Sequence, residues 1–301
     1  MQPQKFTSAN YSDVKRLRVK IFEQNLDIFA RGYYEDKYTG RYRFENTDIL
    51  QEESMMYSEP FELEGYPPVE GGCRVEVVSG DCIEVARTLD RDGYAVALLN
   101  MASSSRPGGG VQSGAGAQEE QLCRRSNLIL SLYRFSPEMI RQYPALGLEK
   151  SEDHYPMHPE WGGIYSPCVT FFRESERKGY ALMDEPFTIG VVSVAALKSP
   201  MLTPGGRLNE KDERTTRRKV RTILRIALEN GHDAIVLGAL GCGAYGNPPS
   251  HVAEIFHQVL EEEEFKDQFR KVVFAILEDH NSLRNPEGGN LAPFKKEFKA
   301  K

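Results

Sequence analysis

The stretch AIVLGALGCGAYGNPP, residues 234–249, decides the fold class. Its first seven residues are apolar except for one glycine, a pattern typical of a strand covered on both faces of a parallel sheet. A glycine-rich loop follows, and from His251 to Glu264 the apolar residues recur at helical spacing. A strand, a loop and a helix in this order predict one repeat of an α/β fold.

The same alternation extends outward along the chain. Apolar runs predict strands at Cys73–Ser79, Tyr94–Asn100, Ile164–Phe172, Phe187–Ala195, Ala234–Leu240 and Val272–Leu277. Helical spacing predicts helices at residues 13–31, at residues 81–89 with Asp81 as N-cap, after Ala117 through Leu132, and from Glu210 to Asn230. We therefore expect a three-layer α/β domain at residues 71–301, with residues 1–70 as a helical and loop extension packed on it.

Composition excludes several classes of protein. The chain has 301 residues, and 38 basic against 44 acidic residues give a net charge of −6, so a chain-wide basic surface for nucleic acid is absent. No apolar run reaches the length of a membrane span, and the N-terminus lacks the apolar core of a signal peptide, so we expect a cytoplasmic protein. Five scattered cysteines without a CxxC pair predict neither a disulfide framework nor a zinc site.

Two glycine-rich loops follow predicted strands. The first carries Gly108, Gly109 and Gly110 after the strand that ends at Asn100, and the second is the loop of residues 238–246. Neither fits the Rossmann or P-loop pattern. Two such loops at the carboxyl ends of strands favour the binding of a ligand that carries a diphosphate. The alternative is that the glycines only allow tight turns of the backbone, without any ligand.

Two adjacent acids, Glu119 and Glu120, stand directly after the first loop. Neighbouring residues on a helix point about 100° apart, so one carboxyl faces a reacting bond while the other holds a neighbouring group. Glutamates in a first helical turn are also favoured by the helix dipole, without any catalytic role. A general acid at this place needs burial or an anionic neighbour to keep its proton.

The order of these pieces resembles a known family. The triple glycine, a spacer of seven residues and Gln118-Glu119-Glu120 are similar to the GGG-x(6–8)-QEE signature of poly(ADP-ribose) glycohydrolases, in their bacterial-type branch. Further similarities follow in the family's order, at residues 77–86, 99–103, 163–167, 193–197 and 237–249. The resemblance implies a macrodomain with a mixed central sheet and hydrolysis of the ribose–ribose O-glycosidic bonds of poly(ADP-ribose).

The resemblance also implies a role for individual residues. Glu120 matches the general acid and base, Glu119 the glutamate that holds ribose hydroxyls, and Gln118 the residue that orients both. Asp81 matches the aspartate that accepts from the adenine amino group, and Asn100 lies beside the ribose. The two ligand-wrapping loops correspond to Gly108, Gly109, Gly110 and Val111, and to Gly241, Cys242, Gly243, Ala244, Tyr245 and Gly246. Tyr245 stands where the bacterial enzymes usually carry Phe.

The resemblance implies neither a metal nor a cofactor. The partners it implies are poly(ADP-ribose) or ADP-ribose and ADP-ribosylated proteins. It implies no binding to a membrane and no sequence-specific binding to nucleic acid. Two alternatives stay open: a reader that binds ADP-ribose without turnover, and a hydrolase of single ADP-ribose units. The two glutamates argue against the reader, since binding alone does not need the pair.

Some residues have two interpretations. The pair Arg124-Arg125 and a second basic run either steer a polyanion or form a solvated helix face. The second run comprises Arg214, Arg217, Arg218, Lys219, Arg221 and Arg225. Cys123 is expected to be a small packing residue, and Trp161 either covers a site or anchors its loop.

Overall fold

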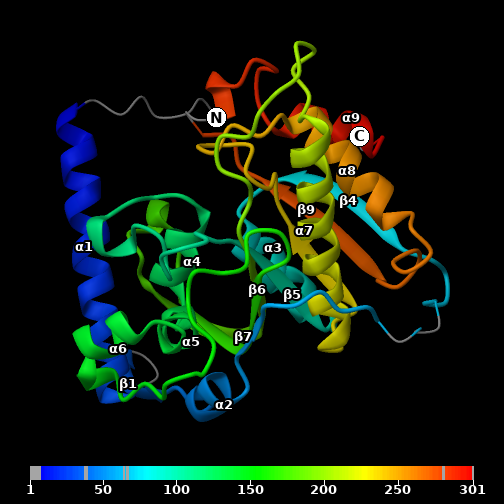
Figure 1. The fold of residues 1–301 in the computed structure, drawn as a ribbon. Coiled ribbons are helices and arrows are strands. Elements are labelled where there is room, and N and C mark those ends of the chain that lie inside the picture. The colour runs from blue at the N-terminus through cyan, green and yellow to red at the C-terminus, as the bar shows by residue number, and fades with distance from the viewer. Residues whose placement is uncertain (1–7, 37–39, 64, 66–67, 280–281, 300–301) are drawn as a thin grey trace. The chain divides into compact units, whose positions relative to one another are not determined.

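A computed structural model describes the chain except for residues 1–7, 37–39, 64, 66–67, 280–281 and 300–301 (Figure 1). Its contacts divide the chain into two compact units. Unit 1 comprises Met1–Met56, Ala102–Pro156 and Ser166–Val191, and unit 2 comprises Tyr57–Met101, Met157–Tyr165 and Val192–Lys301. Among the helices described, none is both long and apolar enough to cross a membrane.

A seven-stranded sheet has the strand order β3-β6-β7-β5-β8-β9-β4. The strands are β3 Met55–Tyr57, β4 Arg74–Ser79, β5 Val96–Met101, β6 Gly163–Arg173, β7 Leu182–Val194, β8 Ala234–Leu237 and β9 Lys271–Ile276. β5, β8, β9 and β4 pair in parallel, with Val96 opposite Ala234 and Arg74 opposite Lys271. β6 and β7 are neighbours joined by the short connection 174–181, which only an antiparallel pair allows, so the sheet is mixed as expected.

The helices of unit 2 are α3 Cys82–Arg91, α7 Glu210–Glu229, α8 Pro249–Leu260 and α9 Leu291–Glu297. Asp81 caps α3 as predicted, because its carboxylate accepts from the backbone N–H of Ile83 at 2.9 Å. Apolar side chains of α7 and α8 form one core with those of β4, β5, β8 and β9. α7 and α8 contact each other, and α3 packs on β5, β8 and β9 (Figure 1).

Unit 1 is built from short elements around one long helix. They are α1 Ser8–Arg31, β1 Tyr33–Asp36, β2 Gly40–Arg43, α2 Thr47–Glu52, α4 Gln118–Arg125, α5 Leu128–Arg134 and α6 Pro137–Gln142, with single 3-10 turns η1 Val111–Ser113, η2 Pro144–Leu146 and η3 Glu176–Lys178. α1 ends at Arg31 because Gly32 takes a left-handed φ of +72°. Phe29, Tyr34, Phe44 and Phe172 pack ring against ring beside it.

Six predicted strands are confirmed within a few residues, but the helix predicted after Ala117 is two helices. The chain is extended at Ser126, with φ −144° and ψ 177°, and forms a β-bridge with Phe171. The Ser126 hydroxyl donates to the carbonyl of Leu122, so it satisfies an end of α4 that the helix itself leaves open. The break therefore depends on a partner distant in the sequence.

Candidate functional site

The two adjacent glutamates lie in the first turn of α4 and are buried, with 4% of Glu119 and 7% of Glu120 exposed. Glu119 accepts hydrogen bonds from the backbone N–H of Ser103 at 2.8 Å and of Gly108 at 3.2 Å. Glu120 accepts from the backbone N–H of Gly110 at 2.8 Å through Oε1. The carboxyl pair therefore holds the first glycine-rich loop from the inside of unit 1.

The triple-glycine turn wraps closely around this pair. Gly108 and Gly109 have left-handed φ values of +74° and +58°. A Cβ on Gly109 would stand 2.5 Å from Glu120 Oε1 and 2.8 Å from Glu119 Oε2, so these oxygens lie at most 2.5 + 2.8 = 5.3 Å apart. Both the backbone conformation and the space require glycine at residue 109.

The two carboxyl groups differ in how they are satisfied. Both oxygens of Glu119 accept a backbone N–H, which stabilises a carboxylate. Glu120 Oε2 is buried and accepts no hydrogen bond from any residue that the structure describes. Glu119 is thus engaged through both oxygens, whereas Glu120 keeps one buried oxygen open to a hydrogen-bond partner.

Two buried groups of unit 1 interact electrostatically with Glu119. Burial raises the pKa of the Cys123 thiol and of the Tyr155 hydroxyl well above their ordinary values, and the charge of Glu119 adds to both shifts. Cys123 is fully buried, so the packing role expected for it is confirmed. Val111 is also buried, in η1, and Gln118 is half-buried at the first residue of α4.

The second glycine-rich loop lies in unit 2 and is held by an asparagine that the sequence did not single out. Asn247, 3% exposed, donates from Nδ2 to the carbonyls of Leu197 at 2.7 Å and Gly241 at 3.1 Å. Gly241 has φ +72°, and a Cβ there would collide with Asn247 Nδ2 and lie 2.6 Å from Ala196 Cβ. A buried amide that bridges two carbonyls has no sequence signal beyond its place after a glycine.

This loop borders a cavity of about 740 Å³ in unit 2. Its lining includes Cys242, Gly243, Ala244 and Gly246 of the predicted loop, together with Arg207, Asn247, Ser250 and Arg284. The Cys242 side chain itself is buried, and burial raises its pKa well above the ordinary value. Tyr245 is half-buried, and its carbonyl accepts from the Ser199 N–H at 2.9 Å.

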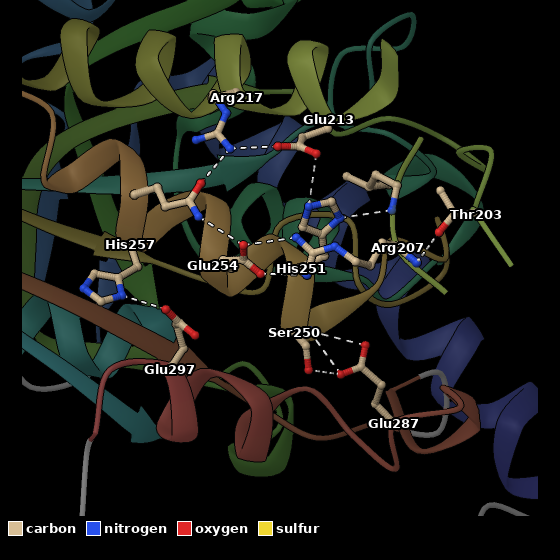
Figure 2. Close-up of polar contacts among 12 residues, drawn as sticks. Thr203, Arg207, Glu213, Arg217, Ser250, His251, Glu254, His257, Glu287 and Glu297 are labelled. Atoms are coloured by element: carbon tan, nitrogen blue, oxygen red, sulfur yellow. Dashed lines mark hydrogen bonds and ion pairs between the residues drawn. The ribbon is translucent and has the colours of Figure 1, made fainter. Parts of the chain in front are cut away.

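The start of α8 is fixed by a polar network (Figure 2). His251 Nδ1 accepts from the Leu208 N–H at 3.0 Å, and Arg207 binds Glu254 with two hydrogen bonds of 2.7 and 3.1 Å. The hydrogen bond from Arg207 lowers the pKa of Glu254, whereas burial, followed by the charge of Arg207, lowers the pKa of His251. These contacts connect the first turns of α8 to residues 207 and 208.

Two further predicted residues lie in unit 2. Asp81 is engaged as the cap of α3, a contact that does not depend on any ligand. Asn100 is fully buried and donates from Nδ2 to Ser193 Oγ at 3.0 Å. Its Oδ1 has no hydrogen-bond partner among the described residues, which leaves one buried acceptor at the end of β5.

Both interpretations of Arg124 and Arg125 are wrong. The side chains are 0% and 1% exposed, so they are neither a solvated face nor a surface that steers a polyanion. Arg124 donates from Nη2 to the Ala115 carbonyl and Arg125 from Nε to the Arg173 carbonyl at 3.2 Å. Sequence spacing misses this because the acceptors lie in the loop before α4 and at the end of β6.

The interpretation of the second basic run as a solvated helix face is wrong for Lys219, which is only 3% exposed, and is supported for the five arginines. On α7 they pair with acids, as Arg214–Glu210, Arg217–Glu213, Arg218–Glu160, Arg221–Glu262 and Arg225–Glu264. Trp161 anchors its loop. Its Nε1 donates to the Ser58 carbonyl at 3.0 Å, and its ring stacks on that of His158 with the two ring centroids 4.3 Å apart.

Known structures resemble this chain closely. The poly(ADP-ribose) glycohydrolase of Thermomonospora curvata matches with a TM-score of 0.75 and 28% identity, over 94% of this chain and 100% of that one. The same protein bound to the inhibitor ADP-HPD matches with a TM-score of 0.71, 30% identity and the same coverage. The Deinococcus radiodurans enzyme in complex with ADP-ribose matches with a TM-score of 0.61 and 26% identity, over 86% of this chain and 98% of that one.

Comparison of the sequence with family models identifies the family of this chain. No curated protein matches the chain by sequence. The family model described as microbial-type PARG, catalytic domain, matches residues 23–174, which include the triple glycine and the Gln118-Glu119-Glu120 triplet. The match covers half of the chain, and the Thermomonospora structures cover nearly all of it. This chain therefore belongs to the family of microbial-type poly(ADP-ribose) glycohydrolases.

Proposed function

We propose that this chain hydrolyses the ribose–ribose O-glycosidic bonds of poly(ADP-ribose) and releases ADP-ribose, with Glu120 as general acid and then general base. Family membership supports the reaction. The observation that carries the assignment of Glu120 is its buried Oε2, which no described residue hydrogen-bonds, beside a Glu119 whose two oxygens are both held.

The reaction proceeds in two proton transfers. Protonated Glu120 gives its proton to the leaving ribose oxygen as the glycosidic C–O bond breaks, and the remaining ribose carries positive charge in an oxocarbenium-like transition state. Water then adds to the anomeric carbon and returns a proton to Glu120. The substrate's own diphosphate stabilises the developing positive charge.

Glu119 has a different task in this scheme. The usual glycosidase arrangement sets two carboxyl groups on opposite sides of the scissile bond. Here both carboxyl groups converge on Gly109 and both bond to backbone N–H groups of one loop. We therefore assign the proton transfers to Glu120 alone and the positioning of ribose hydroxyls to Glu119, with Gln118 orienting the pair.

We propose that ADP-ribose is the unit recognised, and the ADP-ribose complex of the Deinococcus relative supports this. Gly108, Gly109, Gly110 and Val111 contact the ribose and diphosphate through their backbone. The second loop, Gly241, Cys242, Gly243, Ala244, Tyr245 and Gly246, holds the diphosphate, and the ring of Tyr245 packs by the distal ribose. Asp81 accepts from the adenine amino group and Asn100 lies beside the ribose. ADP-ribosylated proteins as carriers of the substrate, and a cytoplasmic location, remain predictions.

The decisive experiment follows the release of ADP-ribose from poly(ADP-ribose) chains by chromatography, with EDTA present. Glu120→Gln should lower turnover on the order of 10²-fold or more and keep ADP-ribose affinity within a few-fold, because only the transferable proton is lost. Glu138→Gln is the matched control, since Glu138 is an exposed glutamate in the first turn of α6 in the same unit.

Each outcome separates the alternatives. Binding of ADP-ribose without turnover by the wild-type protein would mean a reader, and turnover of mono(ADP-ribosyl) protein alone would mean a hydrolase of single units. Full activity of Glu120→Gln would remove Glu120 from the mechanism.

Asp81 needs a test that separates ligand recognition from helix capping. Asp81→Ala removes both the carboxylate and the cap, so affinity should fall by about 1–3 kcal/mol and stability by about 0.5–2 kcal/mol. Asp81→Asn keeps the cap, so calorimetry should show weakened ADP-ribose binding at an unchanged melting temperature. Unchanged affinity in both variants would mean that another residue recognises the adenine.

A further inference from the structure

Helix α1 packs directly on the segment that connects the triple-glycine turn to α4, and both belong to unit 1. A Cβ on Gly114 would lie 2.6 Å from the carbonyl oxygen of Lys15, and a Cβ on Gly116 would collide with the guanidinium of Arg18. Gly116 has no left-handed φ, so its own backbone does not require glycine. The contact with α1 gives the physical reason for glycine at residue 116.

Arg18 is held in place by a bidentate ion pair. Its Nε and Nη2 donate to the Glu176 carboxylate at 2.6 and 3.1 Å, and only 13% and 25% of the two side chains is exposed. Burial alone would raise the pKa of Glu176, but the hydrogen bonds from Arg18 and Tyr180 outweigh it and lower that pKa. A half-buried bidentate pair of this kind fixes a side chain far better than an exposed pair does.

The same guanidinium reaches the backbone that leads to Glu120. Arg18 Nη1 lies 3.4 Å from the Gly114 carbonyl oxygen. The next residue, Ala115, donates its N–H to the Gly110 carbonyl at 3.1 Å, and the Gly110 N–H is the donor to Glu120 Oε1. Arg18 is thus two hydrogen bonds away from the group that orients Glu120.

α1 and the Glu176 carboxylate also reach α4 itself. Gln121, the residue after Glu120, approaches Glu176 with Nε2 at 3.4 Å. At the other end of α4, the buried Asn25 of α1 donates to the Arg124 carbonyl at 2.8 Å. The helix that carries the glutamates is therefore held near its start and at its end.

We propose that Arg18, locked by Glu176, is a positioning residue for Glu120, and that α1 is a working part of the catalytic site. This inference rests on the proposed function. Arg18 keeps the segment 110–116 in the shape that presents the Gly110 N–H to the Glu120 carboxyl. Its loss should lower kcat and leave KM nearly unchanged, because Arg18 itself does not contact the substrate.

The experiment compares Arg18→Ala, Gly116→Ala and the double variant on poly(ADP-ribose). Arg18→Ala should lower kcat about tenfold or more, since small misplacements of catalytic groups are costly. Gly116→Ala should have the same effect by displacing the guanidinium from Glu176. In the double variant the added methyl group has room, so kcat should equal that of Arg18→Ala alone, a non-additivity that direct contact predicts.

Two controls separate positioning from general stability. Arg16→Ala removes an exposed arginine two residues away on the same helix and should leave kcat unchanged. Ile28→Ala loosens the buried face of α1 and lowers the melting temperature without touching the Arg18 contacts. Hydrogen exchange of the backbone N–H groups of residues 110–116 should accelerate in Arg18→Ala and Gly116→Ala but not in Arg16→Ala.

The inference is overturned if Arg18→Ala keeps the kcat of Arg16→Ala, if Ile28→Ala lowers kcat as much as Arg18→Ala does, or if the effects of Arg18→Ala and Gly116→Ala multiply. A wild-type protein without turnover would instead overturn the proposed function. The exchange measurement would then still report whether Arg18 holds the segment, so the two failures are distinguishable.

Discussion

Replacement of Gly109 by alanine tests the geometry of the carboxyl pair most directly. The added Cβ would stand 2.5 Å from Glu120 Oε1, whereas ordinary van der Waals contact begins at 3.4 Å. The carboxyl oxygen must therefore move by 3.4 − 2.5 = 0.9 Å, or the turn must open by the same amount. A misplacement of about 1 Å can cost on the order of 10² in rate, so kcat should fall by roughly that factor.

The control is Gly147→Ala. Gly147 has φ +61°, close to the +58° of Gly109, but nothing lies within 4 Å of a Cβ built there. Both variants bear the cost of a left-handed alanine, about 1–2 kcal/mol of stability, and only Gly109→Ala displaces the glutamates. Comparison of the melting temperatures checks that the backbone cost is shared.

The assay is release of ADP-ribose under single-turnover conditions, which isolates the chemical step from product release. Gly147→Ala should retain the wild-type rate, and Gly109→Ala should lose about 10²-fold at a similar melting temperature. A Gly109→Ala variant that works as fast as Gly147→Ala would refute the close approach of the turn to Glu119 and Glu120.

Two further predictions concern stability and pH in unit 2. Lys219 is 3% exposed, and burial lowers its pKa to about 8, so Lys219→Met should raise the free energy of unfolding in urea at pH 7 by about 1–3 kcal/mol. That gain should shrink as the pH rises from 8 to 10.5, because the wild-type lysine then loses its proton; a constant difference would contradict the burial effect. Burial also lowers the pKa of His251 below 6.5, so the folded state favours the neutral ring and stability should fall as the pH drops below 6.5. His251→Gln should flatten this part of a melting-temperature profile, and an unchanged slope would show that other groups cause it.

The sequence predicted the elements whose cause is local. Apolar runs marked β5, β8 and β9 because a buried strand needs nonpolar residues on both faces. Asp81 marked the start of α3 because a short acceptor satisfies the open N–H groups of the first turn. The polar segment 33–57 gave no such signal, so the hairpin of β1 and β2 and the helix α2 were missed.

The candidate site divides in the same way. The triple glycine and the two glutamates were visible because they are consecutive and their spacing is a motif. The motif does not reveal which glutamate has an oxygen without a hydrogen-bond donor. That depends on where the N–H groups of Ser103, Gly108 and Gly110 lie around the start of α4.

Only the tertiary structure decided which charges are buried. Arg124 and Arg125 read as a basic surface, yet both are inside, where the carbonyls of residues 115 and 173 accept hydrogen bonds from them. Arg18, in a long polar helix, gave no signal until the fold placed Glu176 beside it. A residue's own chemistry determines its local backbone preferences, but the free energy of burying a charge depends on partners that lie far along the chain and meet it only after folding.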